Sequence, residues 1–229
     1  MAFRNHGVEE IVLHTGQHYD RELSAIFFEE LELAPPAIQL DAGSGTHADQ
    51  TARMLPGIER AVLDVEPAAV VVFGDTNSTL AGALAAAKLG TPVAHVEAGL
   101  RSWDRSMPEE LNRIVVDHLA SLLLAPSDTA VANLRREGIG EGVHQVGDVM
   151  YDANLALAPL ARERSTALAD AGVAPGAYAL LTLHREANTR PSALERIVNA
   201  IGRLGEPVVF PVHPRTAGAL AATTLELPE

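Results

Sequence analysis

Acidic and basic side chains crowd one short stretch of this sequence, residues 95–113. The stretch begins at the end of an apolar run, residues 91–96, that is typical of a buried strand, and it finishes on a segment with helical spacing. Its charged side chains include Glu97, Asp104, Glu109, Arg101 and Arg105. Ligands of open α/β sheets bind beyond the carboxyl ends of the strands. Acids and bases at a strand-to-helix connection therefore predict a binding crevice.

Glu97 directly follows the apolar run and precedes Ala98 and Gly99. A carboxyl group in such a poorly solvated position is expected to have a raised pKa, which suits proton transfer at neutral pH. The alternative is a structural ion pair with Arg101, which would keep Glu97 charged and inert. We favour the catalytic interpretation.

Asp75 lies at a similar junction, after the β-branched run at 67–73. Asp75 or Thr76 can cap the following helix by accepting hydrogen bonds from backbone N–H groups. Alternatively, the Asp75 carboxylate faces the crevice as an acid or base. The two interpretations are compatible if Thr76 or Asn77 caps the helix, and both stay open at this point.

Glu109 has a structural explanation beside the chemical one. Ser106 and Glu109 match the S-x-x-E capping box, in which the Glu side chain folds back onto the Ser N–H. Pro108 in the first helical turn supports that interpretation. Glu109 and Arg113 also have the four-residue spacing of a surface ion pair on a helix. Local grounds alone favour a structural role.

Two strand ends in the second half of the chain carry basic side chains. His184 and Arg185 follow the predicted strand at 178–183, and His213 follows the one at 207–212. Imidazole and guanidinium groups bind phosphates, and their repetition predicts a diphosphate site. The sequence contains no H-E-x-x-H, G-x-G-x-x-G or P-loop motif, so we expect neither a metal nor a cofactor.

Hydrophobic periodicity predicts alternating strands and helices. The predicted strands cover residues 10–14, 37–40, 67–73, 91–96, 121–125, 143–146, 178–183 and 207–212. The predicted helices cover residues 20–31, 47–65, 75–89, 108–119, 128–137, 148–171, 191–203 and a segment from 214, with the end of another at 1–6. We expect the strand at 67–73 to be buried on both faces, because it is uncharged and β-branched. In the helix at 108–119, one face by spacing is Leu111, Ile114, Val115, His118 and Leu119.

The first six strands predict an α/β fold with a doubly wound, Rossmann-like parallel sheet. We assign residues 1–148 to this domain, 149–176 to a helical connection, and 177–229 to part of a second, Rossmann-like nucleotide-binding domain. Two strands are too few for a stable independent sheet, and an α/β domain seldom starts on a crossover helix. We therefore expect that a first strand precedes residue 1 and that further strands follow residue 229.

Composition excludes several function classes. The formal net charge of −13 argues against a nucleic-acid-binding surface, which needs a basic face. The absence of cysteine excludes disulfides, thiolate nucleophiles and cysteine-ligated metals, and is typical of a cytoplasmic protein. No run approaches the roughly 18 apolar residues of a membrane span. We expect a cytoplasmic protein with no membrane or nucleic-acid partner.

Seven motifs together resemble the non-hydrolysing UDP-N-acetylglucosamine 2-epimerases, relatives of the two-domain GT-B glycosyltransferases. They are HTGQH (14–18), GDTNST (74–79), HVEAGLR (95–101), MPEELNR (107–113), VGD (146–148), TLHRE (182–186) and PVHP (211–214). Each motif is weak alone, but seven in family order over nearly the whole chain are very specific. The resemblance implies a GT-B-type architecture.

The resemblance also implies the reaction. These enzymes interconvert UDP-N-acetylglucosamine and UDP-N-acetylmannosamine by eliminating UDP to a glycal and re-adding it, which requires acid/base groups near C2 and cations at the diphosphate. By matching position, the catalytic residues would be Asp75, Glu97, Glu109 and His184, and the substrate-binding residues Arg113, Arg185, His213 and Gln17. In some members, contacts that correspond to the last three hold a second, activating UDP-N-acetylglucosamine.

Other functions stay open at the level of sequence. A hydrolysing 2-epimerase would share most motifs and release free N-acetylmannosamine, and a glycosyltransferase relative would pass the sugar to an acceptor. The chain can also be an inactive fragment or a UDP-sugar-binding module. The family begins with a nucleotide-contacting loop and ends with segments that bind uridine diphosphate, and neither occurs here, so we expect weak substrate binding. The family also implies a homodimer.

Overall fold

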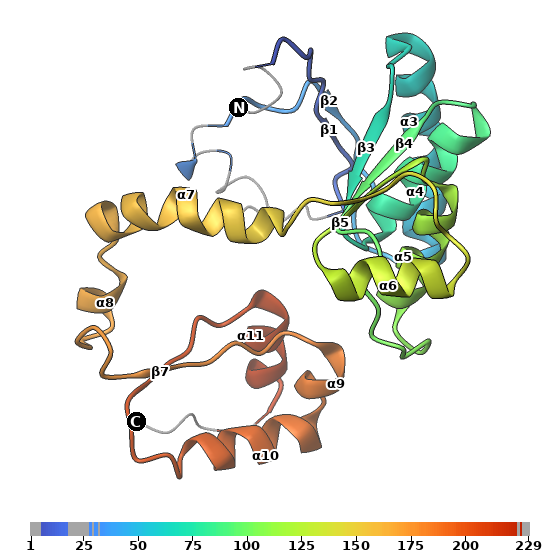
Figure 1. The fold of residues 1–229 in the computed structure, drawn as a ribbon. Coiled ribbons are helices and arrows are strands. Elements are labelled where there is room, and N and C mark those ends of the chain that lie inside the picture. The colour runs from blue at the N-terminus through green and yellow to red at the C-terminus, as the bar shows by residue number, and fades with distance from the viewer. Residues whose placement is uncertain (1–5, 18–27, 29, 32, 224, 226–229) are drawn as a thin grey trace. The chain divides into compact units, whose positions relative to one another are not determined.

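A computed structural model describes residues 6–17, 28, 30–31, 33–223 and 225 (Figure 1). The chain forms two compact units, Met1–Ala153 and Asn154–Glu229. Each unit has its own parallel strands and its own hydrophobic core. The helical stretch expected at 20–31 and the helix end at 1–6 fall largely outside the described residues.

A four-stranded parallel sheet forms the centre of the first unit (Figure 1). Its strands lie in chain order: β3 (Val70–Phe73), β4 (Val93–Val96), β5 (Leu122–Ala125) and β6 (Val143–Gln145). Strands β1 (Leu13–His14) and β2 (Ile38–Gln39) pair in parallel as a second, two-stranded sheet. The α/β class with parallel strands is confirmed. The six expected strands divide into four and two, although Leu13 and Val70 pack on one core cluster.

Helices separate these strands as the periodicity predicts. They are α3 (His47–Val65), α4 (Asn77–Lys88), α5 (Pro108–Leu119) and α6 (Asp128–Arg136). Helix α7 (Val149–Arg164) follows β6, and the short helix α8 (Ala167–Asp170) belongs to the second unit. Helix α3 begins after Thr46, whose side chain accepts from the Asp49 N–H, and ends at Glu66 in the left-handed region with φ 48°. Thr is common at helix N-caps, and a residue in the left-handed region is common at the C-terminal end of a helix.

Small side chains bring α4 close to the sheet. Its inward positions include Ala81, Gly82, Ala83, Ala85 and Ala86, all buried. A β-carbon on Gly82 would lie 3.0 Å from Val72 Cγ1. The low aromatic content therefore gives a thin core in which backbone elements approach one another closely.

The prediction that β3 is buried on both faces is wrong. Val72 is buried, but Val71 and Phe73 are 37% and 58% exposed. Successive side chains of a strand point to opposite faces, so one face of β3 packs against α4 and the other is open. Strand β4 is instead buried on both faces, since all four of its residues are buried.

Helix α5 also turns a different face inward from the one that apolar spacing indicates. Leu111 and Val115 are each 42% exposed. The buried residues of α5 are Glu110, Asn112, Val116 and Asp117. Three of these four are polar, and each makes side-chain hydrogen bonds that repay its burial.

In its described residues the second unit contains one short parallel pair, β7 (Ala179–Leu180) and β8 (Val208–Val209). Its helices are α9 (Glu186–Thr189), α10 (Pro191–Ile201) and α11 (Pro214–Ala221). Leu183, Leu194 and Val198 form its core. The parallel pairing sets the ends of the two strands next to each other.

Gly99 is the tightest backbone position near the end of β4. Its φ is +80°, and a β-carbon there would lie 2.4 Å from the Ala130 carbonyl oxygen. We expect Gly99→Ala to lower the free energy of unfolding by roughly 3 kcal/mol, because left-handed strain and a backbone clash act together. Gly140→Ala is the control, since open space surrounds Gly140. Urea denaturation measures both, and equal stabilities for the two variants would contradict the expectation.

Candidate active site

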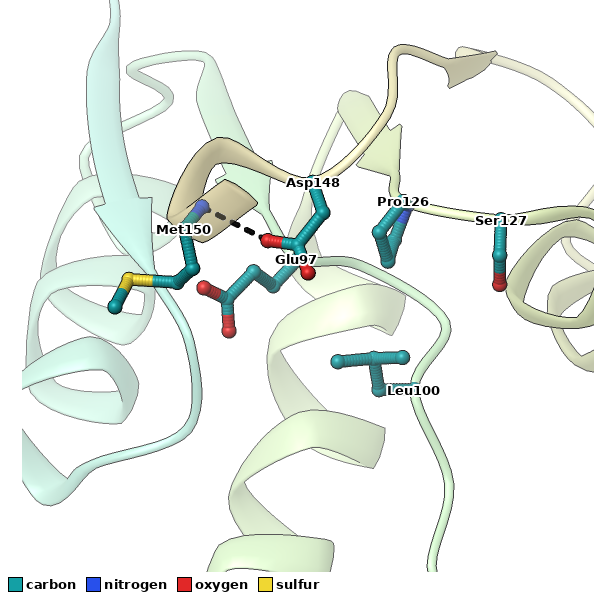
Figure 2. Close-up of a pocket in the computed structure, with 6 residues that line it drawn as sticks. All are labelled: Glu97, Leu100, Pro126, Ser127, Asp148 and Met150. Carbon is teal, nitrogen blue, oxygen red and sulfur yellow. Dashed lines mark hydrogen bonds between the residues drawn. The ribbon is translucent and has the colours of Figure 1, made fainter. Parts of the chain in front are cut away.

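Two acids lie at adjacent strand ends in the first unit. Asp75 follows β3 and Glu97 follows β4, and these strands pair directly. Glu97 lines a cavity of about 260 Å³. The other lining residues are Leu100, Pro126, Ser127, Asp148 and Met150 (Figure 2). The predicted crevice at the carboxyl ends of the strands is therefore present.

Glu97 is held in an unusual conformation and environment. Its φ is +70°, in the left-handed region that few non-glycine residues adopt. Burial raises the pKa of its carboxyl group, and the nearby Asp148 and Asp75 raise it further, while His95 and Arg113 oppose them. Figure 2 shows the Glu97 and Asp148 side chains close together at the cavity. The raised pKa predicted from the sequence is confirmed in direction.

Arg101 does not form the predicted alternative ion pair with Glu97. Its guanidinium binds Asp117 at 2.7 Å and Glu137 at 2.5 Å. Burial disfavours the Arg101 charge, but hydrogen bonds to Glu137 and Asp117 outweigh burial and raise its pKa. The Arg101 side chain is thus paired with Asp117 and Glu137, and Glu97 lines the cavity instead.

Asp75 does not cap α4. Thr76 caps α4 by accepting from the Thr79 N–H, and the Thr79 hydroxyl accepts in return from the Thr76 N–H at 3.2 Å. The Asp75 carboxylate instead binds Arg113 Nη2 at 2.5 Å. Arg113, predicted from the resemblance to bind substrate, thus also holds the Asp75 carboxylate.

The capping-box prediction for Glu109 is wrong. Met107 occupies the N-cap position without a side-chain hydrogen bond, and Ser106 donates to Asp104 instead. Arg113 pairs with Glu110, three residues before it, rather than with Glu109. Glu109 itself is exposed. Its position at the start of α5 is compatible with contact to a ligand.

Glu110 is the structural acid that the sequence analysis missed. It is buried and accepts hydrogen bonds from Ser102, Trp103 and Arg113. Burial would raise the pKa of its carboxyl group, but these hydrogen bonds outweigh burial and lower it. Glu110 thereby ties the loop before α5 to the arginine that holds Asp75. Local sequence patterns show no sign of this role, because the buried face of α5 does not coincide with the face that carries its apolar residues.

Gln17 is placed at the start of α4. Its side-chain oxygen accepts from both the N–H and the hydroxyl of Ser78, at 2.9 and 2.7 Å. Thr15 also contacts the Ser78 hydroxyl, at 2.7 Å. The helix terminus and the loop after β1 are therefore joined within the first unit.

The basic side chains of the second unit gather at the ends of β7 and β8. The rings of His184 and His213 lie 5.8 Å apart between centroids. Arg215 donates to the His184 carbonyl oxygen at 3.2 Å, and its own N–H donates to His213 Nδ1. Arg185 is exposed beside them. The prediction that two strand ends present basic groups together is confirmed.

Comparison with known proteins identifies the family. The family model described as UDP-N-acetylglucosamine 2-epimerase matches residues 1–229.

The chain belongs to the UDP-N-acetylglucosamine 2-epimerase family.

Relatives within the family are close in sequence. A UDP-N-acetylglucosamine 2-epimerase homolog from Methanococcus maripaludis is 50% identical over 91% of this chain and 59% of its own length. A UDP-2,3-diacetamido-2,3-dideoxy-D-glucuronate 2-epimerase from Pseudomonas aeruginosa is 46% identical over 96% of this chain and 63% of its own. The chain thus spans about three-fifths of the length of these epimerases.

A solved epimerase shares the fold. The crystal structure of the UDP-GlcNAc 2-epimerase of Methanocaldococcus jannaschii, in complex with UDP-GlcNAc and UDP, is 44% identical. It superposes with a TM-score of 0.90 over 96% of this chain and 63% of that one. The Rossmann-like, GT-B-type class predicted for this chain is confirmed. Among the described residues, no helix combines the length and apolar character needed to cross a lipid bilayer.

The raised pKa of Glu97 predicts a pH-dependent effect on stability. A group with a raised pKa in the folded state stabilises the fold while protonated, and that contribution is lost as the pH rises through the folded pKa. Glu97→Gln cannot ionise, so we expect it to match the parent chain near pH 4 and to exceed it in stability near pH 7. Thermal unfolding at the two pH values measures the difference, with the exposed Glu59→Gln as control. A stability difference that does not change with pH would contradict the assignment.

Proposed function

We propose that this protein is a non-hydrolysing 2-epimerase that interconverts UDP-N-acetylglucosamine and UDP-N-acetylmannosamine. The observation that carries the proposal is the pair of acids at adjacent strand ends. Glu97 has a raised pKa at a cavity, and Asp75 is fixed by Arg113. Groups of this kind suit proton transfer at a sugar carbon. Membership of the epimerase family supports the same function.

The proposed reaction proceeds by elimination and re-addition. A carboxylate removes the proton from C2 of the sugar, the C1–O bond breaks, and UDP departs with the bonding electrons. The resulting glycal has a double bond between C1 and C2. A carboxylic acid then returns a proton to the opposite face of C2 while UDP re-forms the bond to C1. The products contain the same atoms as the substrate, so no water is consumed.

The proposed roles follow the side-chain environments. Glu97, whose pKa is raised, is assigned to proton transfer at C2, and Asp75, held by its ion pair with Arg113, is assigned as the second acid/base group. Glu109 supplies a third carboxyl group at the start of α5. His184, Arg185 and His213 hold the diphosphate, and Gln17 completes the binding residues. In this proposal residues 177–229 belong to the nucleotide-binding domain.

The identity of the sugar has a second candidate. A relative that matches 96% of this chain is a 2-epimerase of UDP-2,3-diacetamido-2,3-dideoxy-D-glucuronate. That sugar carries a carboxylate and a second acetamido group, and the chemistry at C2 is the same. Assaying both nucleotide sugars in parallel decides between them, and we expect faster turnover of UDP-N-acetylglucosamine.

Deuterium incorporation tests the reaction directly. We expect this chain, incubated with UDP-N-acetylglucosamine in D₂O, to place deuterium at C2 and to form UDP-N-acetylmannosamine, observed by proton NMR. Release of free N-acetylmannosamine instead would assign a hydrolysing epimerase. If only a chain lengthened to the span of its relatives exchanges deuterium, the 229 residues are an inactive part of an epimerase. Exchange in neither would refute the function.

Two neighbouring acids provide a matched pair of variants. Glu109→Gln should leave the free energy of unfolding unchanged within about 0.5 kcal/mol, because the side chain is exposed. It should lower kcat by about 10²-fold or more, because the variant removes an acid/base group. Glu110→Gln should cost roughly 2–3 kcal/mol of stability, because it weakens charged hydrogen bonds. Urea denaturation and turnover measure both effects, and a stability loss in Glu109→Gln would contradict the assignment.

We also propose that the chain forms a homodimer through an apolar groove between α3, α4 and α5. The groove has a volume of about 600 Å³ and is lined by Leu55, Leu80, Pro108 and Leu111, among others. We expect Leu111→Glu to yield monomers in light scattering. Leu204→Glu, which changes an exposed leucine of the second unit, is the control. Monomers in the parent chain would exclude the dimer.

A further inference from the structure

His95 is a buried side chain with two hydrogen-bonding partners. It lies on β4, fully enclosed, two residues before Glu97. Its Nδ1 contacts Asp117 Oδ1 at 2.6 Å, and its Nε2 contacts the Gly74 carbonyl oxygen at 2.8 Å. The ring thus connects α5 to the residue that immediately precedes Asp75.

The partners determine where the protons lie. A carbonyl oxygen only accepts, so Nε2 must carry a proton. The second carboxylate oxygen of Asp117 accepts from the Gly99 N–H at 3.1 Å and from Arg101 at 2.7 Å, as an ionised carboxylate does. Nδ1 therefore donates to Asp117 as well. Protons on both nitrogens would make His95 an imidazolium.

The charges around His95 balance in this state. Asp117 faces it from α5, Arg101 lies beyond Asp117, and Glu137 at the end of α6 pairs with Arg101. Two cations and two anions then form a cluster without net charge, and their mutual attraction offsets part of the desolvation penalty of burying them. On the cavity side, burial, Asp148 and Asp75 raise the pKa of Glu97, and His95 and Arg113 oppose that rise.

The contacts of His95 join the two turns that carry the acids. Gly74 and Glu97 both have left-handed backbones, with φ of +62° and +70°. The Gly74 N–H donates to the Val96 carbonyl at 3.1 Å, and the Gly74 carbonyl accepts from His95. Both peptide groups that flank Gly74 are therefore bonded to β4, which limits how far Asp75 can move relative to Glu97.

We propose that His95, held as an imidazolium between Asp117 and Gly74, is a positioning residue that fixes Asp75 and Glu97 relative to each other for reaction. This role rests on the proposed epimerase function. It concerns geometry and local charge, since the His95 side chain is fully buried.

Two substitutions separate the two hydrogen bonds. Asn places its amide nitrogen near the position of Nδ1 and keeps the donor to Asp117, whereas Gln places it near Nε2 and keeps the donor to Gly74. We expect His95→Asn to lower kcat by about 10²-fold, because a small displacement of reacting groups costs that much. His95→Gln should lose less than about tenfold, and KM should change little in either variant. Both variants lose the positive charge, so the acidic limb of the rate profile should move to higher pH.

The control is His118→Asn, because His118 is an exposed histidine of α5. We expect its kcat and pH profile to match the parent chain. Circular dichroism confirms that each variant folds. Equal rates in the parent, His95→Asn and His95→Gln, or equal losses in the two variants, would overturn the positioning role.

A spectroscopic measurement on the unmutated chain is independent of activity. In ¹⁵N NMR both ring nitrogens of His95 should give the chemical shifts of a protonated imidazolium. A neutral ring with one protonated nitrogen would overturn the proposal. If the imidazolium is present but no chain exchanges deuterium at C2, the proposed reaction fails and the hydrogen-bond assignment stands.

Discussion

The interior of the first unit depends on one buried carboxylate, Asp117. Moving an anion from water into the protein interior costs on the order of several kcal/mol, unless cations and N–H groups replace the lost hydration. Asp117 receives three such replacements, from His95, Arg101 and the Gly99 N–H. These donors come from β4 and from the loop that follows it. One carboxylate therefore fixes α5 against the strand end where the candidate site lies.

A second charged side chain of α5, Arg113, also joins several elements. Arg113 bridges Asp75 and Glu110, and Glu110 in turn holds the backbone of Ser102 and Trp103. The loop before α5, the helix and the end of β3 are joined by this bridge. Helix α5 accordingly buries charged and polar residues and leaves Leu111 exposed.

The carboxyl groups of this region differ because their partners differ. Glu110 accepts several hydrogen bonds, which lower its pKa despite burial. Glu97 faces a cavity beside Asp148, and burial and neighbouring acids raise its pKa. When their environments give two carboxyl groups different pKa values, one can act as an acid and the other as a base at the same pH. The positive φ of Glu97 is compatible with a strained conformation retained for function.

Sequence alone determined the α/β class, the order of elements and the family. Helix α3 occupies the predicted residues 47–65, because a periodic apolar stripe and a cap are local properties of the chain. The raised pKa of Glu97 was also predictable, because burial follows from an apolar strand. Tertiary structure alone decided the partners of the charged groups. Glu110 and Asp117 are buried by contacts with Ser102 and His95, which lie 8 and 22 residues away in the chain. Local spacing pointed to Glu109 and Arg113 instead, because ion-pair geometry depends on where loops from other elements pass the helix.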